Sequence, residues 1–273
     1  MVVLNEKQLQ EICKDMRADI LRMTERAGSG HPGGSLSAVE LMAVLYFNVL
    51  NHKPQEPGWS ERDRFILSKG HACPVLYSAM SRSGYFPVEE LLTLRQLDSR
   101  LQGHPNMKAL PGLECSSGSL GQGLSISNGL AIAAKIDKKN YRVYCLMGDG
   151  ELQEGQVWEA AMTAAHYKLD NVCAIVDYNN LQIDGKVEDV KNIAPLKEKW
   201  QSFNWHVIEI DGHDLIQIFQ AYEEAKGVKK KPTVIIARTI KGKGVSFMEN
   251  VAGWHGKAPN KKELEAALKE IYG

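Results

Sequence analysis

The sequence predicts an α/β fold in which a central, mostly parallel sheet is flanked by helices. Two observations support this prediction. Apolar, partly β-branched runs such as residues 141–147 and 172–176 alternate with Ala-rich or amphipathic segments of helical period. No Pro-, Gly- or Ser-rich linker, repeat or low-complexity tract divides the chain. With 273 residues and 44% apolar content, the chain can bury one large core or two small ones, and we expect a single domain over residues 1–273.

The first half of the chain is expected to be mainly helical. Apolar residues at three- and four-residue steps predict an amphipathic helix over residues 9–23 that ends near Gly28. A glycine-rich loop follows, and the spacing of Ser37 and Glu40 predicts a capping box at the start of a second helix. The remaining elements of this half are, in order, a short buried strand over 65–67, a helix after it, a helix over 87–97 and a loop over 98–123.

The second half carries most of the predicted strands. After an Ala-rich helix that runs to Ile136, residues 141–147, 154–167 and 172–176 predict a strand, a helix and a strand. A right-handed crossover makes these two strands parallel. The last expected elements are a strand over 206–210, a helix introduced by Gly212-His213-Asp214, a strand over 233–238 and a closing helix from Lys261. Five or six parallel strands are predicted in all.

The composition excludes several classes of protein. The 33 basic and 33 acidic residues balance, which gives no electrostatic reason to expect binding to nucleic acid or to an anionic membrane. The N-terminus is charged where a signal peptide needs an apolar region, and no apolar stretch is long enough to cross a bilayer, so we expect a cytoplasmic protein. The five cysteines form no C-x-x-C pair and are expected to be reduced thiols.

Polar residues follow two neighbouring strands of the predicted sheet. Gly148-Asp149-Gly150 follows the strand over 141–147, and Asn179 comes soon after the strand over 172–176. Because parallel strands carry ligand sites at their carboxyl ends, the two side chains are expected to converge. Carboxylate and amide oxygens suit Mg²⁺, with Ca²⁺ as a possible substitute, and the flanking glycines let backbone amides approach a phosphate. This pattern predicts a metal-diphosphate site, although an Asp at a strand end can instead be a turn former or a helix cap.

The eight histidines fall into two groups. His31, His71, His104 and His255 each lie beside a glycine in a predicted loop. Neutral imidazoles around one pocket could donate to sugar hydroxyls and phosphate oxygens and exchange protons near neutral pH. The other histidines are expected to be hydrogen-bonded surface residues: His52, His166, His206 and His213.

Seven short strings give the chain a family resemblance. They are, in order, GSGHPGG, LSKGHA, QGHP, SSGSLGQG, GDGELQEG, DYNNLQIDG and WHGKAP. In this order they resemble the transketolase family over nearly the whole chain. The resemblance implies a thiamine-diphosphate-binding fold and transfer of a two-carbon ketol unit from a ketose to an aldose, with thiamine diphosphate and Mg²⁺ as cofactors.

The resemblance also implies roles for individual residues. Asp149 and Asn179 would bind Mg²⁺ through their side chains, and Leu181 through its backbone carbonyl. Contacts to the cofactor are implied for the residues His71, His255, Gly118, Leu120, Gly148, Gly150 and Glu154, the last at a dimer contact between two active sites. The sugar channel would be lined by His31, His104 and His255, which assist proton transfer. Lys241 and Lys257 are either phosphate contacts or solvated loop lysines.

The chain departs from the family in its length. A complete transketolase has two further domains, one of which supplies the glutamate that activates the cofactor and the groups that bind the sugar phosphate. The resemblance therefore implies the N-terminal subunit of a split transketolase, with a separate C-terminal subunit that carries the pyrimidine-binding half, in an α₂β₂ assembly that acts on sugar phosphates. Three alternatives stay open: the α subunit of a 2-oxo acid dehydrogenase decarboxylating component, a non-catalytic cofactor-binding scaffold, and an α/β domain whose Gly-Asp-Gly is only a turn.

Overall fold

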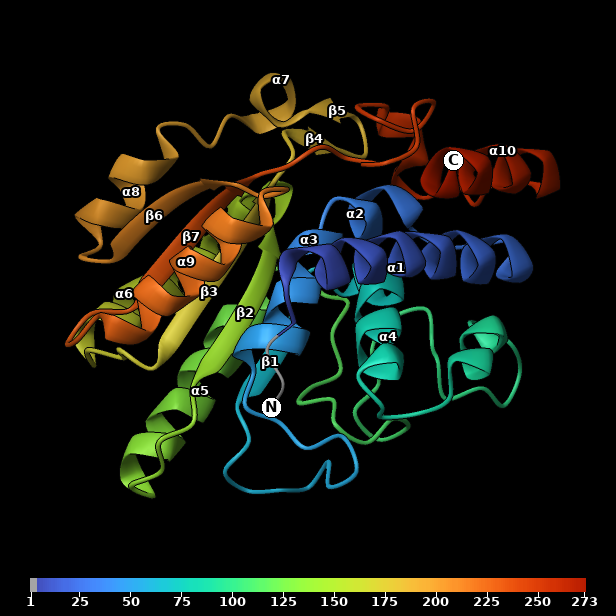
Figure 1. The fold of residues 1–273 in the computed structure, drawn as a ribbon. Helices are drawn as coiled ribbons and strands as arrows, with labels where there is room; N and C mark the ends of the chain where they lie inside the picture. The colour runs from blue at the N-terminus through green and yellow to red at the C-terminus, as the bar shows by residue number, and fades with distance from the viewer. Residues whose placement is uncertain (1–3) are drawn as a thin grey trace.

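A computed structural model describes residues 4–273 and contains one large parallel sheet (Figure 1). Its five strands stand in the order β1-β2-β3-β7-β6 and are all parallel. Their bounds are Arg64–Leu67 for β1, Val143–Gly148 for β2, Val172–Tyr178 for β3, His206–Asp211 for β6 and Thr233–Arg238 for β7. Two short strands, β4 (Leu181–Gln182) and β5 (Gly185–Lys186), form a separate antiparallel pair. The predicted fold class is therefore confirmed.

Helices cover both faces of the sheet. The long ones are α1 (Glu6–Ala27), α4 (Cys73–Arg82), α5 (Gln122–Ile136), α6 (Gly155–His166), α9 (Leu215–Gly227) and α10 (Lys261–Tyr272). The short ones are α2 (Pro32–Leu36), α3 (Val39–Val44), η1 (Leu45–Val49), η2 (Gly70–Ala72), η3 (Val88–Thr93), η4 (Gly150–Gln153), α7 (Val187–Lys191), α8 (Leu196–Ser202) and η5 (Ala252–His255). In Figure 1, α10 runs beside α1, and the Tyr272 hydroxyl donates to Asp15 Oδ1 at 3.0 Å. No helix within residues 4–273 is long and apolar enough to cross a membrane.

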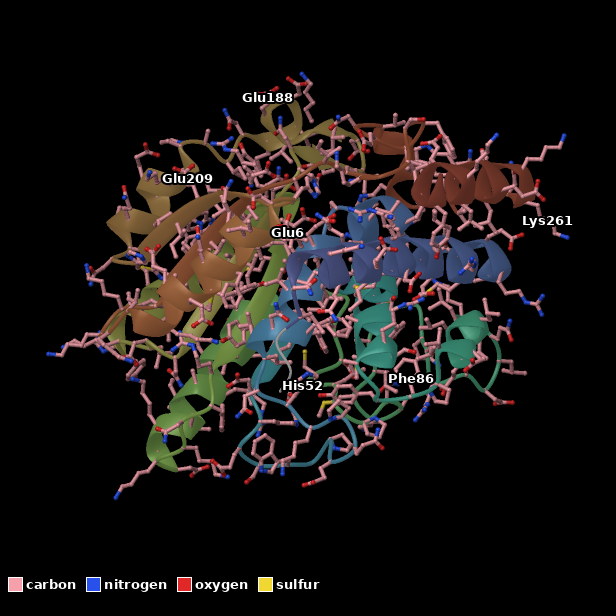
Figure 2. All side chains as sticks on the ribbon, in the orientation of Figure 1. Glu6, His52, Phe86, Glu188, Glu209 and Lys261 are labelled. Carbon is pink, nitrogen blue, oxygen red and sulfur yellow. The ribbon has the colours of Figure 1, made fainter. Side chains whose placement is uncertain are left out.

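The alternation of side chains along the strands builds two apolar cores. Tyr144 and Leu146 of β2 belong to the core that contains the buried residues of α1, α3, α4 and α9. Cys145 and Met147 of the same strand belong to the core beneath α5, α6 and α8. Successive side chains of a strand point to opposite faces, so a strand that is covered on both faces has to be apolar throughout. The edge strand β6 is more exposed, and its Glu209, labelled in Figure 2, pairs with Lys197 at 2.9 Å.

The strand order reverses direction between β3 and β7. The chain moves along the sheet from β1 to β3, then crosses to the far edge at β6 and returns to place β7 beside β3. Open parallel sheets bind ligands outside their carboxyl ends, close to such a reversal. The segments after β1, β2, β3 and β7 therefore meet in one place.

Two local predictions are wrong. Ser37 caps no helix, because the chain already turns helical at Pro32, and the Ser37 hydroxyl donates to Asp177 Oδ2 at 2.6 Å. Glu40 pairs with Arg17 and His213 and does not bond back to the helix start. The helix expected over 87–97 is the shorter 3₁₀ segment η3. At Ser37 and Glu40 tertiary contacts of polar side chains outweigh the local pattern.

Candidate active site

A pocket of about 330 Å³ lies at the carboxyl ends of the central strands. It is lined by segments that are far apart in the sequence. These lining residues are His31, Gly34, Lys69, His71, Gly118, Leu120, Gly148, Asp149, Gly150, Glu151, Gln153, Glu154, Asn179, Leu181, Gln182, Ile183, Asp184, Lys241 and His255. The reversal of strand order thus holds a polar cavity, as expected for this class of fold.

Asp149 is a buried acid of this pocket. It caps η4, and its carboxylate accepts hydrogen bonds from the backbone N–H groups of Gly150, at 2.7 Å, and Asn180. Burial and the neighbouring Asp177 carboxylate raise the pKa of Asp149 to about 7. The two backbone donors and the attraction of Lys241 do not offset these effects, so the carboxylate is suited to meet a cation.

Three histidines form a contiguous cluster on one side of the pocket. The ring centroids of His71 and His255 are 5.0 Å apart, and the ring centroid of His31 lies 5.3 Å from that of His71 and 5.5 Å from that of His255. Burial is the main cause that lowers the pKa of His31 to about 4, of His71 to about 2 and of His255 to about 3, and nearby cations add to the effect. All three imidazoles are therefore neutral at pH 7, and each can donate one hydrogen bond and accept another.

Two buried lysines supply the positive charge. Lys69 follows β1 and is 2% exposed; its ammonium donates to Gly34 O at 2.7 Å and pairs with Asp177. Lys241 follows β7 and is equally buried, and its ammonium donates to Leu181 O at 2.9 Å and lies 3.0 Å from His255 Nδ1. Burial lowers the pKa of Lys241 to about 8, against the attraction of Asp149. An anion in the pocket would restore some of the lost solvation of this ammonium group.

Asp177 joins the segments around the pocket. This fully buried carboxylate ends β3 and accepts hydrogen bonds from Ser37, Lys69 and Thr239. The three donors come from the loop between α2 and α3, the segment after β1 and the segment after β7. The attraction of Lys69 and these hydrogen bonds hold the pKa of Asp177 below its usual range although burial raises it. One ionised side chain therefore fixes the relative positions of three strand ends.

The structure brings nearly all the predicted site residues together. The pocket lining includes every one of them except His104, whose ring centroid lies 6.2 Å from that of His31. Lys241, left open by the sequence, also lines the pocket. Lys257 does not, because its ammonium pairs with Glu263 at 2.8 Å and lies over the Trp254 ring.

Two of the four histidines expected at the surface are placed differently. His52, labelled in Figure 2, is half-buried beside the loop before β1, and its ring nitrogens bond to the Tyr85 hydroxyl and to Tyr46 O. His213 is also half-buried and bonds to Glu40 and to the backbone of Ile240. These predictions are wrong, since a position next to a turn does not reveal which buried groups pack over it. His166 is exposed, and His206 pairs with Glu224 at the surface.

Three buried ionisable residues of the site were not identified from the sequence: Lys69, Glu151 and Asp177. Glu151 accepts hydrogen bonds from the Gly121 and Gly148 amides at 2.8 Å and 3.0 Å and from Ser68. Only Asp177 has a sequence feature that could have marked it as a site residue. It stands at the end of an apolar strand, and Asp149, which was identified, directly follows another. Lysine and glutamate in a loop are usually solvated, so Lys69 and Glu151 carry no such signal.

The doubly covered parallel sheet, with an acid and buried lysines at its switch point, places the chain among the α/β proteins that bind a ligand at the carboxyl ends of their strands. The model of the family "Transketolase, thiamine diphosphate binding domain" matches residues 8–273. The chain is 43% identical over 270 residues to a 6-deoxy-6-sulfo-D-fructose transketolase subunit from Clostridium sp. (strain MSTE9), with 98% of each chain covered. It is 41% identical over 255 residues to an apulose-4-phosphate transketolase subunit from Phocaeicola vulgatus, covering 93% of this chain and 90% of that protein.

A solved structure also points to the transketolase family. The crystal structure of transketolase from Campylobacter jejuni is similar with a TM-score of 0.93 and 37% identity, over 98% of this chain and 43% of that one. The chain therefore belongs to the transketolase family and corresponds to its thiamine diphosphate-binding domain. The family, fold and enzyme class predicted from the sequence are confirmed. The chain spans less than half the length of that full transketolase and nearly all of the two similar subunits.

Proposed function

We propose that this chain, acting as a single diphosphate-binding domain, is one subunit of a two-subunit transketolase that transfers a two-carbon ketol unit from a ketose to an aldose. The observation that carries the proposal is the pocket whose lining combines Asp149, Asn179 and Leu181 with Lys241 and His71. This combination offers oxygen ligands for a cation beside donors for an anion. A metal-bound diphosphate needs both within a few ångströms.

The donor set fits Mg²⁺, with Ca²⁺ as a possible substitute. Asp149 supplies a carboxylate, Asn179 an amide oxygen and Leu181 a main-chain carbonyl. Leu181 lines the pocket, and its carbonyl, which accepts one hydrogen bond from the Lys241 ammonium, has a second lone pair that can meet a cation. No group of three or more His, Cys, Asp or Glu side chains that could hold a metal occurs among the described residues 4–273. The proposed site therefore relies on neutral oxygens and a single charge, which suits a metal that keeps water and phosphate ligands.

Thiamine diphosphate, when bound, would supply the nucleophilic carbon and the electron sink for cleavage and formation of the C–C bond. The residues of this chain hold its diphosphate end: Lys241, His71 and His255 donate to phosphate oxygens, and Gly118 and Leu120 pack beside it. Glu154 is proposed for the contact between two active sites. His31, His104 and His255 donate to hydroxyl and carbonyl oxygens of the sugar and take up or release protons there.

The proposed partner is a C-terminal transketolase subunit that completes the site, with an α₂β₂ assembly. The similar proteins from Clostridium and Phocaeicola act, by their names, on a sulfonated ketose and a ketose phosphate. We therefore propose a sugar that carries a phosphate or another anionic group.

The test is a mixing experiment. The purified chain, its candidate partner and the mixture are assayed for ketol transfer with Mg²⁺, thiamine diphosphate, xylulose 5-phosphate and ribose 5-phosphate, and with 6-deoxy-6-sulfofructose as a second donor. We expect activity only in the mixture, and a mass consistent with two copies of each chain. Full activity of the isolated chain, or decarboxylation of pyruvate by the pair without ketol transfer, would contradict the proposal.

A further inference from the structure

A buried row of polar side chains runs from α1 to the segment that carries Lys241. Arg17 of α1 pairs with Glu40 of α3, and both are less than 10% exposed. The other carboxylate oxygen, Glu40 Oε2, lies 3.0 Å from His213 Nδ1. His213 Nε2 accepts from the backbone N–H of Ile240 at 2.8 Å. The row therefore ends one residue before Lys241.

The hydrogen bonds fix the state of the His213 ring. A backbone N–H can only donate, so Nε2 has to be the unprotonated nitrogen. The proton of the neutral ring is then on Nδ1, from which it donates to Glu40. If both ring nitrogens carried protons, the Nε2–H group would point at the backbone N–H of Ile240, and two donors would face each other. The row thus holds a neutral His213 in one tautomer, and this tautomer is the one that binds the segment after β7.

Arg17 holds the same segment at a second point. Its Nε donates to Lys243 O at 3.0 Å. Gly244 has a φ of +90°, and a Cβ there would lie 2.6 Å from Arg17 Nε, so the backbone passes directly over the guanidinium group. On the other side, Gly242 N–H donates to Gly33 O at 3.0 Å. Residues 240–244 are therefore fixed by α1, α2 and the loop before α9.

Lys241 lies between these fixed points. Its side chain is 2% exposed and crosses the wall of the pocket to reach Leu181 O and His255 Nδ1. A buried ammonium placed between such partners needs an exact backbone position, because the aliphatic part of the side chain has no free space to adjust. Gly33, for example, leaves room for the Lys241 chain: a Cβ there would lie 3.2 Å from Lys241 Cγ.

We propose that Arg17, Glu40 and His213 are positioning residues for the proposed cofactor site: they fix the backbone at Ile240 and so place the Lys241 ammonium where it binds the diphosphate. This inference rests on the proposed function for the identity of the ligand. The placement of residues 240–244 by these three side chains does not depend on the proposed function.

The experiment compares four proteins: wild type, His213→Phe, His213→Gln and His206→Ala. Phenylalanine fills the space without an acceptor, whereas the glutamine amide can both accept from Ile240 and donate to Glu40. His206 is the matched control, since it also pairs with a glutamate, Glu224 at 2.6 Å, but does so at the surface. Two readouts are used: dissociation constants for Mg²⁺ with thiamine diphosphate and with inorganic pyrophosphate, by calorimetry, and amide hydrogen exchange of a peptide that covers residues 239–244, without cofactor.

We expect His213→Phe to weaken both affinities by roughly tenfold or more, the range seen when supporting residues around a metal site are removed. Exchange over residues 239–244 should accelerate while the rest of the protein exchanges as before. His213→Gln should restore most of both properties, and His206→Ala should change neither. Unchanged affinity and exchange in His213→Phe would overturn the inference, as would faster exchange throughout the molecule, which indicates a general structural role. If wild type binds neither ligand even when the partner subunit is present, the proposed function fails, and the exchange of residues 239–244 still decides whether His213 positions this segment.

Discussion

The two walls of the pocket are built in different ways. The first wall, residues 148–154 and 179–182, follows directly from β2 and β3, and several of its polar groups bond to one another: Asp149 to Gly150 and Asn180, and Gln153 to Gln182. The second wall, residues 239–244 and 252–255, follows β7 and is held by residues from the first quarter of the chain and by His213. A short motif can specify the first wall, whereas the second depends on correct packing of the whole fold.

The largest effect is expected at Asp177, which joins the two walls. Asp177→Asn removes the charge that compensates the buried Lys69 and weakens the bond to Thr239. Removing one partner of a buried ion pair lowers the free energy of unfolding by about 3–5 kcal/mol. Urea unfolding at pH 7 measures the loss, with the exposed Asp189→Asn as the control. A loss no greater than that of the control would show that the walls are joined by other contacts.

The next largest effect tests the first wall alone. We expect Asp149→Asn to weaken binding of Mg²⁺ and thiamine diphosphate on the order of 100-fold, because it removes the only charged ligand of the proposed set. This is the upper end of the range seen when residues that hydrogen-bond to metal ligands are replaced. Calorimetry gives the dissociation constant. Asp184→Asn is a matched control, since Asp184 lines the same pocket but is exposed. Equal losses in the two variants would contradict the assigned donor set.

A smaller effect is expected from a glycine of the second wall. Gly242 has a φ of +79°, and a Cβ there would lie 2.4 Å from Met248 O. Gly242→Ala should therefore lower the free energy of unfolding by about 1–3 kcal/mol. The control is Gly28→Ala, which has a similar φ of +60° but no atom within 4 Å of the added Cβ. If the two variants lose the same stability, the loss comes from backbone strain and not from packing of the second wall.

The smallest effect is a pH dependence of the second wall. The ion pair with Arg17 and the bond from His213 hold the pKa of Glu40 below its usual value of 4.5, although burial raises it. The unfolded chain then binds more protons at this group, so its contribution to stability is present above pH 4.5 and is lost as the pH falls below it. The stability difference between wild type and Glu40→Gln in urea should accordingly shrink from pH 6 to pH 3.5. A constant difference would show that the charge of Glu40 does not stabilise the fold.

The contrast between the walls also explains what could be predicted from sequence. Apolar periodicity predicts the sheet and its helices, since burial on two faces demands apolar strands such as β2 and β3. The ends of these strands predict Asp149 and Asn179, because topology alone brings them together. The burial of Lys69 and Lys241 could not be predicted, since it depends on segments far away in the sequence. For the same reason His213 carries no sequence signal, although it lies within a recognisable helix start.

The neutral histidine cluster has a consequence for the two half-reactions of the proposed transfer. His31 and His255, the two rings of this cluster proposed for proton transfer, hold an added proton weakly near pH 7, because burial and nearby cations disfavour their charged forms. Each ring therefore returns to the neutral form after any proton that it accepts. Cleavage of a ketose and addition to an aldose require protons to move in opposite directions. A cluster that gains no lasting charge can therefore serve both half-reactions in turn with the same side chains.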